Sequence, residues 1–270
     1  MTGIEQTRRR AILDPRTAAE RFRLTQEPAP PDLAPFLDGF WILHWNLAEP
    51  HRQRVLTHPV VHLTFTTGGQ ARITGVVTGT STQEISGTGR AVGLRFRPGG
   101  FRPFLDAPVS TLTDRVLDAE EVFGTRARAV ADAVAAEPGV PAALLLAAGL
   151  LRDVRPTPDP EIDTAARLVG VIGDDPAVLR TGHLAAIAGM SVRRLQRLFA
   201  QYVGVGPKWV IRRTRMQEAA ARAAASPQNW SDLAAELGYA DQAHFTRDFT
   251  ACVGVSPAAY ASSARGPNGS

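Results

Sequence analysis

The sequence predicts an α+β protein, in which a β-rich amino-terminal half precedes an all-helical carboxy-terminal domain. Between about residues 40 and 96, short aromatic and β-branched runs alternate with glycine-containing turns, which indicates several short antiparallel strands. From about residue 161 to 260, apolar residues recur at helical spacing. We therefore expect a small antiparallel β barrel or sandwich with packed helices, then two similar helical units joined by one long helix.

The composition is that of a soluble globular protein. Hydrophobic residues make up 44% and charged residues 21% of the 270 residues, a length that has room for two domains. The single cysteine, Cys252, cannot form an intramolecular disulfide and matches no zinc-site spacing. The amino terminus lacks a signal-peptide core, and the most apolar run, residues 140–151, is too short to span a bilayer. We expect a cytoplasmic protein with no membrane partner.

Five segments follow one another along the chain. Proline clusters near residue 30 and between residues 153 and 160 mark the boundaries between them. The segments are a loosely ordered lead-in (1–30), a β-rich sensor or dimerisation domain with carboxy-terminal helices (31–152), a Pro-rich linker (153–160), the helical domain (161–262) and a disordered tail (263–270).

In the amino-terminal half, strands are expected first and helices after them. The expected strands are 40–45, 60–66, 71–77 and 91–96, and the expected helices are 120–123, 125–136 and 142–151. The last helix is apolar enough to be a buried core helix, and a contact in a homodimer is the alternative for it. Gly99 and Gly100 precede a short helix, where a tight turn requires glycine and an anion site is the alternative.

The helical domain contains the same small unit twice. At an offset of 50 residues, 191–210 and 241–260 share six identities: Arg197/Arg247, Phe199/Phe249, Val203/Val253, Gly204/Gly254, Val205/Val255 and Pro207/Pro257. Each copy is expected to form a short helix, a glycine-containing turn and a second helix capped by Ser191 or Asp241. A two-helix unit of this kind is typical of DNA readers.

The second helix of each copy presents polar groups opposite its apolar face. In the first copy Arg193, Gln196 and Arg197 share one face, and Arg and Gln side chains can recognise guanine and adenine edges. The second copy offers a more neutral set: Gln242, Ala243, His244, Thr246 and Arg247. We therefore expect the first copy to supply most of the base discrimination and the second mainly docking.

Basic residues are concentrated around the first copy and the helix that follows it. Residues 191–222 contain eight Lys and Arg side chains against Glu218 alone, as nucleic-acid binders often do. The connecting helix, residues 207–225, would be about 28 Å long, close to the roughly 34 Å between successive major-groove faces. The expected phosphate or backbone contacts are Ser191, Arg194, Lys208, Arg212, Arg213 and Thr246. For the side chains on the connecting helix, a solvated helix face is the alternative.

These residues carry a family resemblance. The runs Leu195-Gln196-Arg197-Leu198-Phe199, Gly204-Val205-Gly206-Pro207, Asp241-Gln242-Ala243-His244-Phe245 and Gly254-Val255-Ser256-Pro257 closely resemble the DNA-binding domain of AraC/XylS-type transcription regulators. Val210 and Gly206 depart from the Tyr and Ser that are common there.

The resemblance implies two helix-turn-helix units in adjacent major grooves of double-stranded promoter DNA. It also implies base contacts at Arg193, Gln196, Arg197, Gln242, Ala243, His244 and Arg247, a structural role for Arg215, and RNA polymerase as a partner. The β-rich half is similar to sensor-like domains of regulators from GC-rich bacteria, which implies an unknown small-molecule effector and gives no ligand for it.

A metal-dependent, cupin-like enzyme domain fused to a DNA-binding module is the alternative function. His44, His51, His58 and His62 lie within 19 residues, and a barrel could bring them together. No His-x-His pair occurs, however, and Glu49 is the only carboxylate among them. Cys252 is expected to be a buried structural thiol. We therefore expect no catalytic residues, no metal site, no cofactor and no enzymatic activity.

Overall fold

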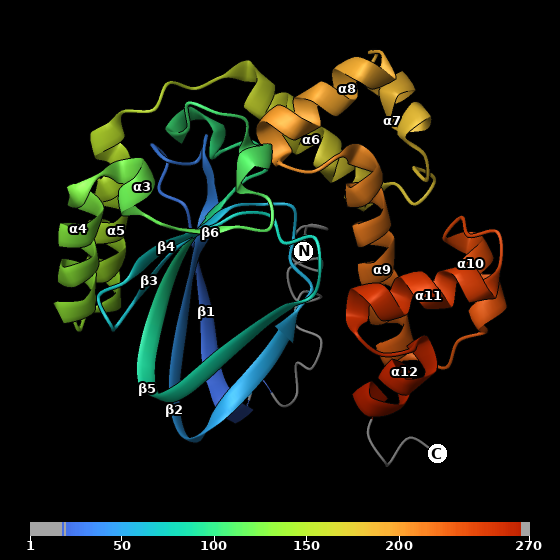
Figure 1. Ribbon diagram of the computed structural model, residues 1–270, viewed down its shortest axis with the longest axis horizontal. Coiled ribbons are helices and arrows are strands. Elements are labelled where there is room, and N and C mark those ends of the chain that lie inside the picture. The colour runs from blue at the N-terminus through green and yellow to red at the C-terminus, as the bar shows by residue number, and fades with distance from the viewer. Residues whose placement is uncertain (1–17, 19, 266–270) are drawn as a thin grey trace.

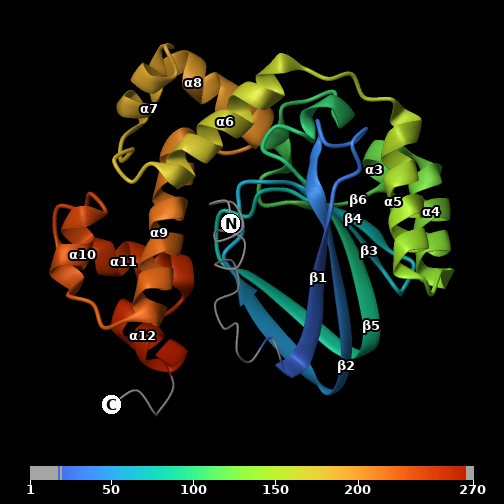
Figure 2. The same ribbon diagram turned by 180° about the vertical axis from the view of Figure 1, so that it is seen from behind.

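The computed structural model describes residue 18 and residues 20–265, and it has the α+β architecture expected from the sequence. One six-stranded antiparallel sheet has the strand order β1-β2-β5-β3-β4-β6 (Figure 1). The strands are β1 (Phe22–Pro28), β2 (Leu37–Val55), β3 (His62–Thr66), β4 (Ala71–Thr74), β5 (Ser81–Phe96) and β6 (Val116–Asp118). We call residues 20–154 the sheet part and residues 160–265 the helical part, which lies beside the sheet in Figures 1 and 2.

Two long strands, β2 and β5, form the centre of the sheet. They pair in antiparallel register, with Phe40 opposite Leu94 and Ile42 opposite Val92, and a bulge interrupts the ladder between Leu47 and His51. Side chains alternate between the two faces of a strand, so Phe40 and Ile42 point together to the apolar side.

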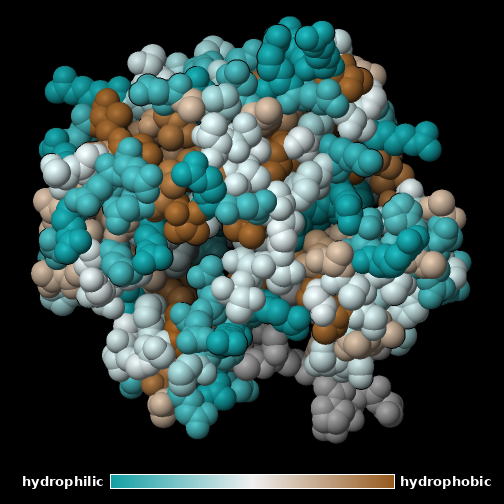
Figure 3. Space-filling view, in the orientation of Figure 1, coloured by the Kyte–Doolittle hydropathy of each residue, from teal (hydrophilic) through white to brown (hydrophobic). Residues whose placement is uncertain are grey.

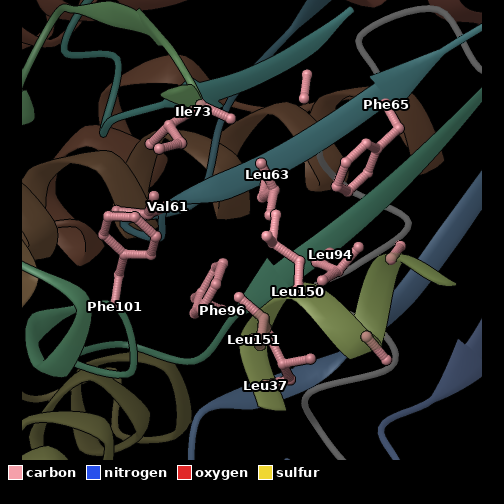
Figure 4. Packing of buried hydrophobic residues seen from close by; sticks show 14 of the residues in the cluster. Leu37, Val61, Leu63, Phe65, Ile73, Leu94, Phe96, Phe101, Leu150 and Leu151 are labelled. Atoms are coloured by element: carbon pink, nitrogen blue, oxygen red, sulfur yellow. The ribbon is translucent and has the colours of Figure 1, made fainter. Parts of the chain in front are cut away.

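The apolar face of the sheet is covered by helices. In β3, Leu63 and Phe65 are buried and the other three residues of the strand are half-buried, as alternation between two faces predicts. Leu150 and Leu151 reach this face from a helix, and Figure 4 shows them directed at the strand residues. The sheet part contains the helices α3 (Glu120–Phe123), α4 (Thr125–Ala136) and α5 (Val140–Val154), and the 3-10 turns η1 (Arg102–Phe104) and η2 (Val109–Leu112).

The sheet is open, whereas a barrel or sandwich was expected from the sequence. Among the described residues, β1 pairs only with β2 and β6 only with β4. A sheet can hide its apolar face by curling into a barrel, but here α4 and α5 cover that face instead. Helix α5 buries Ala147 and Leu151 on this side and exposes 64% of Leu145 on the other.

The helical part is organised around one long helix, α9 (Pro207–Ala225). Its elements are α6 (Pro160–Asp174), α7 (Thr181–Ile187), α8 (Val192–Leu198), the π-helical turn η3 (Phe199–Val203), α9, α10 (Trp230–Glu236), α11 (Gln242–Val253) and α12 (Pro257–Arg265). Pro207 occupies the first turn of α9, where its missing N–H costs nothing. Figure 2 shows α9 joining the α6–α8 group to the α10–α12 group.

Both ends of the chain differ from the expected segments. Phe22–Pro28 forms the edge strand β1, so this portion of the expected lead-in belongs to the sheet because its backbone groups pair with β2. Residues 1–17 and 19 lie outside the described residues. The expected tail overlaps α12 as far as Arg265, and residues 266–270 lie outside the described residues. Within the described ranges no helix is long and apolar enough to cross a membrane.

The paired glycines before η1 are explained by close packing. Gly99 has φ +87°, and a Cβ on Gly100 would lie 2.1 Å from the carbonyl oxygen of Phe36. A side chain would be strained at the first position and would clash with backbone at the second. The tight turn therefore accounts for both glycines without an anion.

A half-buried histidine makes the sheet part sensitive to acid. The indole N–H of Trp41 donates to Nδ1 of His62 at 3.2 Å, so this nitrogen must be unprotonated. Burial, followed by the positive charge of Arg95, lowers the pKa of His62 from 6.5 to about 3. Between these two values the unfolded chain binds the proton and the folded chain does not, so the free energy of unfolding falls as the pH falls.

We expect wild-type protein to lose about 1–2 kcal/mol of unfolding free energy between pH 6.5 and pH 5 through this group. Urea unfolding at the two pH values measures the loss, and His62→Gln, which keeps a side-chain acceptor but does not titrate, should show less of it. An identical pH dependence in both proteins would contradict this assignment.

Candidate nucleic-acid interface

The first helix-turn-helix unit consists of α7 and α8, joined by a turn at Gly189 with φ +61°. Leu195 and Leu198 of α8 are buried against Leu184 of α7. The hydroxyl of Ser191 accepts from the backbone N–H of Arg194 at 3.3 Å and caps α8. The opposite face of α8 is therefore left to solvent, and the side chains on it are Arg193, Gln196 and Arg197.

The second unit repeats this geometry with α10 and α11, joined by a turn at Gly238 with φ +81°. The carboxylate of Asp241 accepts from the N–H of His244 at 2.7 Å and caps α11. Phe245 and Phe249 lie on the buried face of α11. Its outer face exposes Gln242, Ala243, His244 and Arg247, and Thr246 is half-buried.

Helix α9 connects the two units, and Arg215 on this helix makes internal contacts that stabilise the helical part. Its guanidinium donates to the carbonyl oxygens of Ile172 at 2.9 Å and Asp175 at 2.7 Å, and it pairs with Glu218 at 2.8 Å. Only 2% of Arg215 is exposed. This agrees with the structural role that the family resemblance implied for Arg215.

Apart from the half-buried Thr246, the residues expected to contact phosphate or the DNA backbone fall into three groups. Ser191 and Lys208 are exposed. Arg194 and Arg212 are also exposed but have partners, Glu161 at 3.5 Å and Asp248 at 2.7 Å. Only 3% of Arg213 is exposed, because its guanidinium is enclosed by the sheet part, so in this conformation Arg213 does not contribute to the DNA-facing surface.

A carboxylate on α11 connects several of these groups, and the sequence analysis missed it. Asp248 accepts from Arg212 at 2.7 Å and from the hydroxyl of Tyr239 at 3.1 Å, and it lies 3.8 Å from Nε2 of His244. Burial, and then the charge of Asp248, raise the pKa of Tyr239. The signal for this cluster was the i, i+4 spacing of His244 and Asp248 on one helix face.

The histidines of the sheet part do not form a metal site among the described residues, where no group of three or more His, Cys, Asp or Glu could hold an ion. His51 contacts Gln53 at 3.2 Å, and His62 accepts from Trp41. Burial raises the pKa of the Cys252 thiol, which disfavours the reactive thiolate.

Two family models match the chain. Residues 25–118 match a domain of unknown function (DUF6597), and residues 184–263 match a helix-turn-helix domain. An uncharacterized HTH-type transcriptional regulator of Haemophilus influenzae is 35% identical over 77 residues, which are 28% of this chain. The matched region spans only 26% of that curated relative.

Solved structures of ToxT from Vibrio cholerae are similar over most of the chain at low identity. One has a TM-score of 0.40 and 10% identity, covering 90% of this chain and 97% of its own. Another, of ToxT bound to an unsaturated fatty acid, has a TM-score of 0.39 and 8% identity, covering 89% and 95%. The carboxy-terminal match confirms the prediction that this chain carries a helix-turn-helix domain of the AraC type.

Alanine substitutions at Arg215 and Arg197 distinguish an arginine that stabilises the fold from one on the exposed surface. We expect Arg215→Ala to lower the free energy of unfolding by about 3 kcal/mol, because it leaves two buried carbonyl groups without their donor. The exposed Arg197→Ala should change it by less than about 0.5 kcal/mol. Urea unfolding of both variants measures the difference, and equal losses would show that Arg215 is not held as described.

Proposed function

We propose that this protein is a sequence-specific DNA-binding transcription regulator of the AraC/XylS type. One observation carries the proposal: two capped recognition helices, α8 and α11, expose polar faces and are joined through α9. A helix that presents Arg and Gln beyond its capped end fits the major groove. In this proposal the protein acts on promoter DNA as a regulator rather than as an enzyme, and the match of residues 184–263 to a helix-turn-helix domain supports the DNA-binding role.

In this proposal the base contacts come from the exposed faces of the two recognition helices. Arg193, Gln196 and Arg197 read one major groove, and Gln242, Ala243, His244 and Arg247 enter the next. Contacts to the DNA backbone come from Ser191, Arg194, Lys208, Arg212 and Thr246. Arg194 and Arg212 are themselves exposed and would exchange a carboxylate partner for a phosphate, which costs least for the more exposed pair of Arg194 with Glu161.

The division of the chain supports a regulatory role for the sheet part. We place the sensor or dimerisation domain at residues 31–152, the linker at 153–160 and the DNA-binding domain at 161–262, consistent with the short segment between α5 and α6. The exposed Leu145 and Leu146 of α5 suit contact with a second copy. The proposed partners are a small-molecule effector, bound by the sheet part, and RNA polymerase. The proposed location is the bacterial cytoplasm.

Arg197 provides the sharpest test of base readout. Genomic DNA fragments from the source organism are incubated with the full chain, and the bound fragments are recovered and sequenced. On a recovered site, Arg197→Ala should cost about 1–3 kcal/mol and relax the preference at one base pair. Arg128→Ala on α4 is the control for net charge, because Arg128 is exposed on the sheet part and pairs with Asp132.

Two outcomes would reject the proposal. Recovery of no enriched sequence by wild-type protein would exclude sequence-specific binding. An unchanged ratio of site to scrambled DNA in Arg197→Ala would exclude α8 as the recognition helix.

Lys208 tests the phosphate contacts. Lys208→Ala should weaken binding equally on site and scrambled DNA, and it should reduce the slope of log affinity against log salt by about one. Titrations at several salt concentrations measure the slope. A change of base preference with an unchanged slope would assign Lys208 to readout instead.

A further inference from the structure

The sheet part holds both recognition helices at the same position of the internal repeat. Gly204 and Gly254 are equivalent in the two copies and end their helices with φ +97° and +89°. In the first copy, the hydroxyl of Thr113 donates to the carbonyl oxygen of Gly204 at 2.6 Å. In the second, the hydroxyl of Thr80 donates to the carbonyl of Cys252 at 2.9 Å.

The same two glycines are closely approached by the sheet part. A Cβ on Gly204 would lie 3.2 Å from a methyl carbon of Val109, and one on Gly254 would lie 2.7 Å from a guanidinium nitrogen of Arg54. Arg54 also donates to the carbonyl of Val253 at 3.3 Å, which places a cation at the carboxy-terminal end of α11, where the helix dipole favours it. Different segments of the sheet part thus contact equivalent turns.

Each helix-turn-helix unit also buries one apolar side chain of the sheet part. Val76, which follows β4, is 1% exposed and belongs to the core of the first unit with Leu195. Leu56, which follows β2, is fully buried in the core of the second unit with Phe245. Burying a side chain of this size stabilises the contact more than a surface hydrogen bond does, so both cores extend across the junction.

Arg213 joins the two contacts in the middle of α9. Its guanidinium donates to the carbonyl oxygens of Val77, Thr78 and Gly79 at 3.0, 2.9 and 2.7 Å and stacks over Trp209 at 4.8 Å. The carboxylate of Asp114 holds the same loop, accepting from the N–H and hydroxyl of Thr78, each at 2.6 Å. The loop is thereby fixed to α9 between the two units.

We propose that the sheet part is a clamp that sets the position of α8 relative to α11, and that regulation of DNA binding acts through this clamp. The inference rests on the proposed function. A protein that inserts two recognition helices into DNA must match their separation to the spacing of two major-groove faces. Without the clamp, only α9 and the contacts within the helical part would fix the position of α8 relative to α11. A ligand of the sheet part changes DNA affinity to the extent that it distinguishes two arrangements of residues 54–56, 76–80 and 109–113.

The only cysteine of the chain lies at the clamp and reports on it without DNA. Cys252 is partly buried, and its Sγ lies 3.3 Å from Arg213. We expect Thr80→Val, which removes the hydrogen bond without changing the side-chain shape, to make the thiol react about fivefold faster with a chromogenic aromatic disulfide, because opening becomes easier. Arg54→Gln should act in the same direction.

Thr88→Val is the matched control for this measurement. Thr88 lies in β5, the strand that begins directly after Thr80. Its hydroxyl donates to the side-chain oxygen of Asn46 at 2.7 Å, away from the helical part. Its thiol reactivity should equal that of wild type, and circular dichroism should show every variant folded. Thiol rates of Thr80→Val and Arg54→Gln that match the Thr88→Val rate would overturn the clamp.

DNA spacing provides the second measurement. On a fragment recovered by wild-type protein, insertion of two base pairs between the half-sites turns one by about 70°. The insertion should lower the DNA affinity of wild-type protein at least about tenfold. It should lower the affinity of the double variant Thr80→Val, Thr113→Val clearly less, because that variant has lost a clamp hydrogen bond at each unit. Thr88→Val is again the control, since Thr88 bonds to Asn46 and lies outside the clamp segments.

The outcomes separate the two proposals. If wild-type protein enriches no DNA, the proposed function fails, and the thiol rates still decide whether the clamp exists. If wild-type protein binds and the clamp variants keep the wild-type spacing dependence, the clamp does not control readout and this inference is overturned.

Discussion

The arrangement of the whole molecule depends on two buried guanidinium groups that leave α9 in different directions. Arg213 and Arg215 are two residues apart, so they are turned by about 200° from each other around the helix. Arg215 bonds to carbonyl groups at the carboxy-terminal end of α6, and Arg213 bonds to carbonyl groups of the sheet part. A guanidinium has only donors and is costly to bury without partners. Arg215 therefore ties α9 to the end of α6, and Arg213 ties it to the sheet part.

The same attachments reduce the charge that is available to DNA. Of the eight basic side chains in residues 191–222, five have partners within the protein: Arg194, Arg212, Arg213, Arg215 and Arg222. For Arg193, Arg197 and Lys208 no internal ion pair or hydrogen bond of the side chain occurs among the described residues. Exposed pairs can exchange a carboxylate for a phosphate, whereas the two buried arginines cannot do so without opening the structure. The local charge excess read from the sequence thus overstates the positive charge that is free to contact phosphate. In the proposed function, the base contacts from α8 gain weight accordingly.

Features encoded by local chemistry could be predicted from the sequence, and features created by contacts between distant segments could not. The caps at Ser191 and Asp241, the proline at the start of α9 and the outward face of α8 follow from spacing within a few residues. The role of Arg213 does not, because its partners are carbonyl groups more than 130 residues away and a buried arginine and a phosphate-binding one look alike in a helix. Strand β1 was missed because its apolar alternation is limited to Phe22 and Leu24, and every residue after Phe22 is exposed. Whether a sheet closes depends on its twist and covering, which short strand patterns do not specify.

The two reading units share a backbone and differ in how their polar groups are held. In the first unit, Arg193 and Arg197 extend from α8 and are free to adapt to a base edge. In the second, Asp248 bonds to Arg212 and lies beside His244, so two residues of the proposed DNA-binding surface share one carboxylate. A carboxylate near the groove repels phosphate but also limits the rotamers of its partners, which lowers the entropy lost on binding. The polar groups of the second unit are thus held in place and carry little net positive charge, whereas the first unit presents two arginines without an internal partner among the described residues. Base discrimination by the first unit and docking by the second is the division of labour that this difference favours.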